Sequence, residues 1–195
     1  MKILIDNGHG IDTKGKRSPC GTLLEWQYTR NIATRIENEL KSKGYDAERI
    51  VTEDKDIPLG DRTKRINAQC DKYGKDNVFV ISIHVNAAKN GEWANGRGWS
   101  AYTSKGKTKS DILATLLYEE ASKNFVGHRV RKDYSDGDAD WEENFYILKQ
   151  TKCVAVLTEN FFMDNKDDMT YLLSDIGQEN IAKTHVDAII KYVNL

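Results

Sequence analysis

Four residues whose side chains can bind a metal or carry a proton stand where predicted strands end or a helix begins. His9 follows the first apolar run of the chain, His84 ends the strongest one, and Glu159 ends the last. Glu25 stands at the start of the first long helical pattern. Because functional groups of open α/β sheets collect at the carboxyl ends of strands, we expect these four side chains at one edge. Two histidines and two glutamates at one edge predict a hydrolytic zinc site.

The two glutamates are predicted to do different work. Catalytic zinc usually takes three nitrogen or carboxylate ligands and leaves a fourth position for water. His9, Glu25 and His84 can supply these three ligands. A fourth group must then take a proton from the water and pass it to the leaving nitrogen, and Glu159 is our candidate for this role. Glu159 follows the apolar run 154–157, where a charge without a partner would be costly.

Taken singly, each of these residues has an ordinary structural explanation. A lone histidine most often caps an element or lies partly buried, and we expect this of His128 and of His185, at the edge of the core. Glu25 alone would be a charge favoured by the helix dipole, and Glu159 alone could be half of a buried ion pair. Only their combination at one edge favours the metal site.

The three cysteines, Cys20, Cys70 and Cys153, form no familiar pattern. Their number is odd, their spacing is wide and no CxxC pair is present, so we expect neither a disulfide framework nor a structural zinc site. Cys20 lies between His9 and Glu25 in the sequence and remains an alternative ligand. We disfavour it because thiolates prefer closed structural sites.

Apolar runs alternate with helical periodicity along the chain, without an internal repeat or a low-complexity linker. The predicted strands are 2–6, 46–51, 78–85, 98–103, 145–148 and 153–159. The predicted helices are 25–43, 58–73, 110–125 and 181–193. Strands that alternate with helices predict an α/β protein, a three-layer α/β/α sandwich with a largely parallel (mixed) central sheet.

The composition places the chain among soluble globular proteins. A length of 195 residues suits a single domain, 1–195, and two full domains would be a tight fit. The formal net charge of −1 provides no basic field for nucleic acid or for an anionic membrane. No apolar run approaches the roughly 20 residues that span a bilayer. We therefore expect no nucleic-acid partner and no membrane partner. Separately, we expect a monomer.

The segment 132–144 is acidic and polar, and its only large apolar residues are Tyr134 and Trp141. Its acidic members are Asp133, Asp136, Asp138, Asp140, Glu142 and Glu143. We predict an exposed loop or a local insertion that borders the cleft and affects substrate choice more than folding.

Five segments in order resemble the zinc-dependent N-acetylmuramoyl-L-alanine amidases of the type called amidase-3. Segment 5–10 (IDNGHG) resembles the family's opening DxGHG motif, and 82–87 (SIHVNA) closely resembles its S-I-H-x-N-A strand. Glu25 and the helix that follows are similar to the family's ligand-bearing first helix. Segments 59–68 and 157–165 are similar to its L-x-x-R helix and to its glutamate-bearing end.

This resemblance implies Zn2+ on His9, Glu25 and His84, with Glu159 as the catalytic carboxylate. It also implies hydrolysis of the amide bond between N-acetylmuramic acid and L-alanine, with peptidoglycan (a glycan strand with its stem peptide) as the partner. The first apolar run is too short for a signal peptide. We therefore expect either a chain that stays in the cytoplasm until lysis releases it, as in an endolysin, or a mature secreted form such as an autolysin, acting on the cell wall.

Two other functions remain open on the sequence alone. The first is another zinc peptidase that acts on peptidoglycan stem peptides or on free peptides. The second is a catalytically silent wall-binding module, against which the intact set of four candidate residues argues. Product analysis separates them, because only the amidase releases stem peptides with a new alanine amino terminus.

Overall fold

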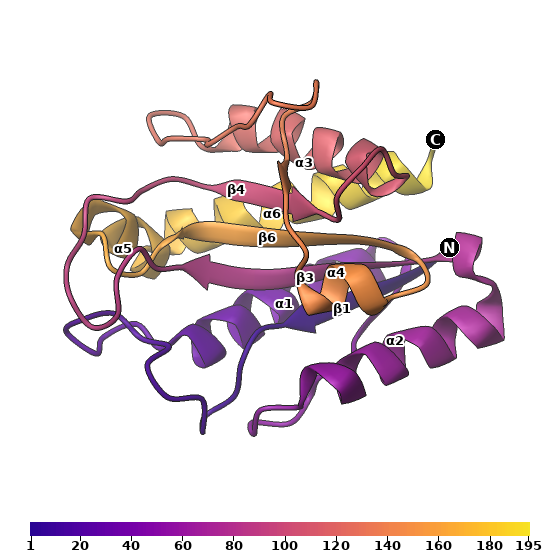
Figure 1. Ribbon diagram of the computed structural model, residues 1–195, viewed down its shortest axis with the longest axis horizontal. Coiled ribbons are helices and arrows are strands. Elements are labelled where there is room, and N and C mark those ends of the chain that lie inside the picture. The colour runs from indigo at the N-terminus through magenta and orange to yellow at the C-terminus, as the bar shows by residue number, and fades with distance from the viewer.

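The computed structural model describes residues 1–195 and contains one six-stranded sheet in the order β2-β1-β3-β6-β4-β5 (Figure 1). The strands are β1 (Lys2–Asn7), β2 (Asp46–Arg49), β3 (Val78–Asn86), β4 (Ser100–Thr103), β5 (Trp141–Glu142) and β6 (Val154–Phe162). β1 pairs in parallel with β2 and β3, and β3 pairs in parallel with β6, whereas β4 is antiparallel to β6. The predicted largely parallel, mixed sheet is confirmed.

Helices cover both faces of this sheet. They are α1 (Glu25–Ser42), α2 (Leu59–Tyr73), α3 (Ser110–Asn124), α4 (Tyr146–Gln150), α5 (Lys166–Leu173) and α6 (Asp175–Val193), with a short 3-10 turn, η1 (Lys75–Asn77). One core cluster contains residues of α1, α3 and α6, and the other contains residues of α2 and α4. Along β1, Ile3 and Ile5 belong to the first cluster and Leu4 to the second, because side chains alternate across a strand. The architecture is therefore the predicted three-layer sandwich.

The two central strands explain why the site forms where it does. Residues 78–83 of β3 are all buried, which accounts for the nearly continuous apolar run of a strand covered on both faces. Because β1, β3 and β6 are parallel, their carboxyl ends lie at one edge of the sheet. The register there places His84 opposite Glu159. The loop that carries His9 begins at the end of β1, on the other side of β3.

The structure corrects several predicted elements. Within 145–148, predicted as a strand, Phe145 precedes helix α4 and the other residues begin it; the consecutive residues Ile147 and Leu148 both pack in the second core cluster. Periodicity cannot distinguish such a short apolar run from a buried helical turn. The closing helix begins earlier than predicted, at Asp175, where the Ser174 side chain accepts a hydrogen bond from the first turn. Neither α5 nor β5 is evident from apolar periodicity.

No helix of the protein combines the length and the apolar character needed to cross a membrane.

Candidate metal centre and active site

Three of the four predicted side chains meet at the carboxyl edge of the sheet. His9 comes from the loop after β1, Glu25 is the first residue of α1, and His84 lies near the end of β3. Each offers one ligand atom, and these atoms all lie within 4.8 Å of one another. Glu25 stands between the histidines, with Oε2 3.4 Å from His9 Nε2 and Oε1 3.3 Å from His84 Nδ1. The two imidazole rings are 5.1 Å apart and nearly perpendicular.

The backbone of the His9 loop needs its two glycines. A Cβ on Gly8 would lie 2.4 Å from Cε1 of His84, and a Cβ on Gly10 would lie 1.9 Å from the backbone nitrogen of Asp56. His9 itself has φ 63°, a left-handed conformation that non-glycine residues rarely adopt. The sequence Gly8-His9-Gly10 therefore allows close approach on both sides of a strained histidine.

Glu25 has the surroundings expected of a metal ligand. Its side chain is buried, Oε1 accepts a hydrogen bond of 3.0 Å from the Val85 backbone, and Oε2 has no hydrogen-bond donor. Burial opposes its ionisation, but the hydrogen bond and charge of His84, with smaller contributions from His9 and the Val85 backbone, outweigh burial and lower the pKa of Glu25. A buried carboxylate oxygen without a donor, beside two imidazole nitrogens, is a donor set that suits Zn2+.

The two histidines titrate differently. Burial lowers the pKa of His9 to about 4, and the charge of Glu25 only partly opposes this. His9 is therefore neutral at pH 7, the form in which imidazole binds a metal. Burial also acts to lower the pKa of His84, but the hydrogen bond and charge of Glu25 outweigh it and raise that pKa. A metal ion would thus compete with a proton at His84.

Glu159 lies beside this cluster. It lines the same cavity as His9 and His84, and its Oε2 is buried without a hydrogen-bond partner. Burial raises its pKa to about 7, although the charge of His84 acts in the opposite direction. A carboxyl group that titrates near neutral pH can both accept and donate a proton during a reaction.

The cavity above these residues has a volume of about 450 Å³. One part of its lining is apolar and comes from the β2–α2 connection, α2, β6 and the α4 region: Ile57, Pro58, Leu59, Phe145, Ile147 and Leu157. Thr13, Lys16 and Asp56 contribute polar groups. Sequence reasoning missed Phe145 and Tyr146 as lining residues because it assigned them to a strand. It also gave no role to Lys16, which follows the His9 loop and whose charge partly opposes the rise in the pKa of Glu159 that burial causes.

The remaining histidines and Cys20 lie outside the cluster. Cys20 is exposed and its thiol contacts Ser18, Thr22 and Met169, so the structure does not support it as a ligand. His128 stacks on Tyr171 with ring centroids 3.8 Å apart. His185 is fully buried, deeper than the predicted edge of the core. Neither histidine belongs to the candidate metal cluster, and both pack against other parts of the protein, as expected.

The acidic segment 132–144 is more structural than predicted. Asp140 is only 2% exposed and accepts a hydrogen bond of 2.7 Å from Thr103. Trp141 and Glu142 form β5, which extends the sheet. None of the residues lining the cavity comes from this segment, since the lining resumes at Phe145. The prediction that the segment borders the cleft is therefore wrong, because its buried anchors fix it to β4 instead.

Comparisons with known proteins agree with this geometry. The family model described as N-acetylmuramoyl-L-alanine amidase matches residues 3–191. The endolysin of Bacillus phage SPP1 is 29% identical over 198 residues, which cover 99% of this chain and 66% of the relative. The amidase CwlM of Bacillus licheniformis is also 29% identical, over 100% of this chain and 70% of its own length. This chain thus spans about two thirds of the length of these relatives.

Solved structures show the same fold. The crystal structure of an N-acetylmuramoyl-L-alanine amidase from Clostridium difficile 630 superposes with a TM-score of 0.81 at 26% identity, covering 99% of this chain and 96% of that one. The catalytic domain of CwlV, from Bacillus (Paenibacillus) polymyxa, superposes with a TM-score of 0.82 at 21% identity, covering 100% of this chain and 99% of that one, a likeness of fold.

Proposed function

Because the chain belongs to the N-acetylmuramoyl-L-alanine amidase family, we propose that it hydrolyses the bond between N-acetylmuramic acid and L-alanine with Zn2+ on His9, Glu25 and His84. The expected family and reaction class, amide hydrolysis in peptidoglycan, are confirmed by the family match and by the relatives. The metal, its ligands, the role of Glu159, the action of this chain on the cell wall and the monomeric state are proposals.

The main support for the metal proposal is that one carboxylate oxygen of Glu25 has no hydrogen-bond donor. Its Oε2 is buried without a donor, and one nitrogen of each neighbouring histidine lies within the same 4.8 Å cluster. The cluster lies at the cavity that His9 and His84 line, so substrate and water could reach a metal ion held there. Bound at this position, Zn2+ would supply a Lewis acid that polarises the substrate carbonyl and strengthens water as a nucleophile.

Glu159 then acts as the proton carrier. In the reaction, a water oxygen bonds to the lactyl carbonyl carbon and the carbon–nitrogen bond to L-alanine breaks. Glu159 accepts the proton that water loses and delivers it to the leaving nitrogen. Its pKa of about 7 suits both steps. The products are a lactyl carboxylate on the glycan and a stem peptide with a free alanine amino terminus.

Product analysis on purified peptidoglycan tests the reaction. We expect new amino termini on L-alanine, no new reducing ends, loss of turnover after chelation and recovery after Zn2+ is added. New amino termini at other stem residues would instead identify a stem peptidase. Binding to the wall without any product would identify a silent module, and full turnover after complete metal removal would refute the zinc proposal.

A further inference from the structure

The carbonyl oxygen of His9 receives two arginine side chains from two different helices. Arg30 of α1 donates from Nη1 at 2.9 Å, and Arg62 of α2 donates from Nη2 at 3.3 Å. His9 is also the residue with the left-handed φ of 63°. Such a conformation persists only where the surroundings determine it more strongly than the local backbone preference does. The two arginines are the groups in direct contact with the carbonyl of this strained residue.

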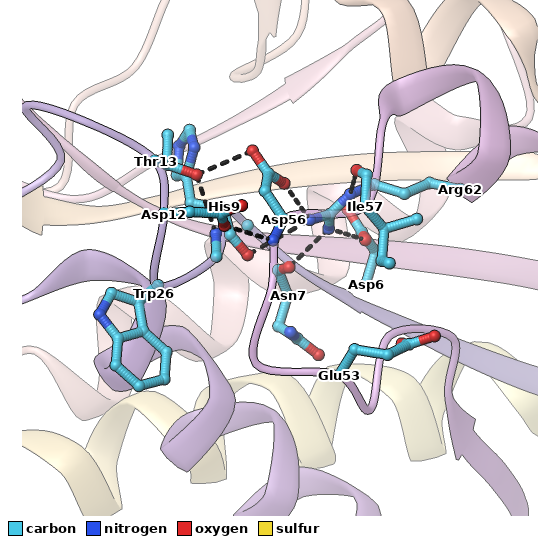
Figure 2. A network of polar contacts seen from close by, with 12 residues as sticks. Asp6, Asn7, His9, Asp12, Thr13, Trp26, Glu53, Asp56, Ile57 and Arg62 are labelled. Carbon is cyan, nitrogen blue, oxygen red and sulfur yellow. Dashed lines mark hydrogen bonds and ion pairs between the residues drawn. The ribbon is translucent and has the colours of Figure 1, made fainter.

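Arg62 has its full donor capacity engaged. Its side chain is 2% exposed, and Figure 2 shows it among the segments that it joins. The guanidinium nitrogens donate to Ile57 O (2.7 Å), Asp6 Oδ1 (2.6 Å), Asn7 O (2.6 Å), Asp56 Oδ1 (2.9 Å) and His9 O. Arginine has five N–H groups in a planar fork, and these five acceptors use all of them. Arg62 therefore has no donor left for a substrate, although it borders the cavity.

The acceptors of Arg62 continue toward both histidines. Asp6 accepts a second hydrogen bond, at 2.5 Å, from Ser82, which lies two residues before His84 on β3. Asp56 accepts from Thr13 at 2.8 Å, and the Thr13 hydroxyl accepts from the Gly10 backbone at 3.0 Å (Figure 2). The loop is thus fixed on both sides of His9, and the same network reaches the strand that carries His84.

Arg30 connects the His9 loop with the helix of the third candidate ligand. It lies on α1, the helix that begins at Glu25, and Nη1 also donates to Trp26 O at 3.0 Å. Its Nε and Nη2 both donate to Glu53 O. The His9 carbonyl therefore connects, through one arginine, to the Glu25 helix and, through the other, to the β1 end and the segment 56–57.

We propose that Arg62 and Arg30 are positioning residues that hold the His9 peptide in its left-handed conformation and thereby set the affinity and geometry of the metal site. The proposal rests on the proposed zinc site. With the backbone held, the imidazole is already directed at Glu25 and His84 before metal arrives. Without the guanidinium groups, the loop can relax toward ordinary backbone angles and displace Nε2. Groups that orient metal ligands typically change metal affinity by about 10–100-fold when they are removed.

Lysine substitutions test this because lysine keeps the charge but lacks the planar fork. Zinc affinity is measured by competition with a chromogenic chelator, and ligand geometry by the visible absorption spectrum of the Co2+-loaded protein. Arg62→Lys should bind zinc about 10–100-fold more weakly and change the cobalt spectrum. Arg30→Lys should shift both readings in the same direction. Turnover should fall mainly in kcat, because Arg62 has no donor left for a substrate and Arg30 does not line the cavity.

Arg65→Lys is the matched control. Arg65 lies on α2 close to Arg62 and donates to Ile50 O (2.7 Å) and to Glu53 Oε1 (2.6 Å) and Oε2 (3.0 Å), without contact to the His9 loop. The Arg65→Lys variant should bind zinc with wild-type affinity and give the wild-type cobalt spectrum. An equal loss in Arg65→Lys would show a general effect of the helix and would overturn the proposal.

The remaining outcomes are decisive as well. Wild-type zinc affinity and an unchanged cobalt spectrum in both Arg62→Lys and Arg30→Lys would overturn the positioning role while leaving the zinc site intact. Should Arg62→Lys fail to fold, as judged by its thermal melt, Arg30→Lys decides alone. A wild-type protein that binds no zinc would refute the proposed metal centre and this proposal together.

Discussion

The protein holds histidines in two environments that differ in how completely the neighbouring polar atoms are paired. At the edge of the sheet, His9 and His84 flank Glu25, whose Oε2 has no donor. Within the helical layer, His185 Nδ1 lies 2.7 Å from the Ile181 carbonyl and Nε2 lies 2.9 Å from the Thr158 hydroxyl. Because a carbonyl only accepts, Nδ1 donates and Nε2 accepts, so the neutral ring is fully paired.

The backbone shows the same contrast. His185 lies in the regular helix α6, whereas His9 has a left-handed φ between two glycines that leave no room for a Cβ. Buried polar atoms without partners and strained backbone are both costly, and folded proteins keep them mainly where function requires them. His185 therefore has the fully paired surroundings of a structural residue, whereas the cluster of His9, Glu25 and His84 combines an unpaired carboxylate oxygen with a strained backbone.

The largest expected effect follows from the unpaired carboxylates. Glu159→Gln should retain zinc and the fold while kcat falls by about 10²–10⁴-fold, because the proton carrier is lost. Glu25→Gln should lose zinc affinity and turnover together. Zinc content and turnover are measured on both variants after dialysis against equal zinc. If Glu159→Gln lost its zinc while Glu25→Gln kept it, the two roles would be reversed.

The sequence predicted those parts of the site that depend on residue type and position along a strand. His9, His84 and Glu159 follow apolar runs, and parallel strands bring the ends of such runs together, so three-dimensional proximity was predictable. The role of Arg30 could not be predicted from the sequence. Its partners are backbone carbonyl oxygens of distant residues such as Glu53 and His9, and residues of every type have such a carbonyl.

The α4 region and the acidic segment show a different reason for failure. The run from Phe145 to Leu148 is too short for its apolar pattern to distinguish a strand from a helical turn. In the acidic segment, the buried Asp140 depends on Thr103, which lies far away in the sequence. The acidic composition of the segment therefore predicted that Asp140 would be exposed, whereas the fold buries it with Thr103 as its hydrogen-bond donor.

The paired histidine should matter for stability and not for catalysis. His185→Ala removes a fully buried ring and leaves the Thr158 hydroxyl without this partner, so the free energy of unfolding should fall by about 1–3 kcal/mol. Turnover per folded molecule should not change. His128→Ala, which removes a less buried ring stacked on Tyr171, is the matched control and should cost less. Urea unfolding and zinc content are measured on both. A loss of zinc in His185→Ala would contradict the division between the two environments.

The smallest effect concerns pH. Burial lowers the pKa of His185 in the folded protein to about 4, whereas an unfolded histidine titrates at about 6.5. Between these values the unfolded chain binds a proton that the folded protein does not, so the free energy of unfolding falls as the pH falls. The contribution of His185 to the free energy of unfolding should fall by about 1 kcal/mol between pH 7 and pH 5.5.

Urea unfolding of the metal-free protein tests this. The variant His185→Gln has no titrating ring at this position, so its free energy of unfolding should fall correspondingly less over this pH range. His9, whose pKa burial also lowers to about 4, contributes equally in both proteins, so the difference between the two curves isolates His185. Parallel curves would show that the buried ring of His185 does not control this acid sensitivity.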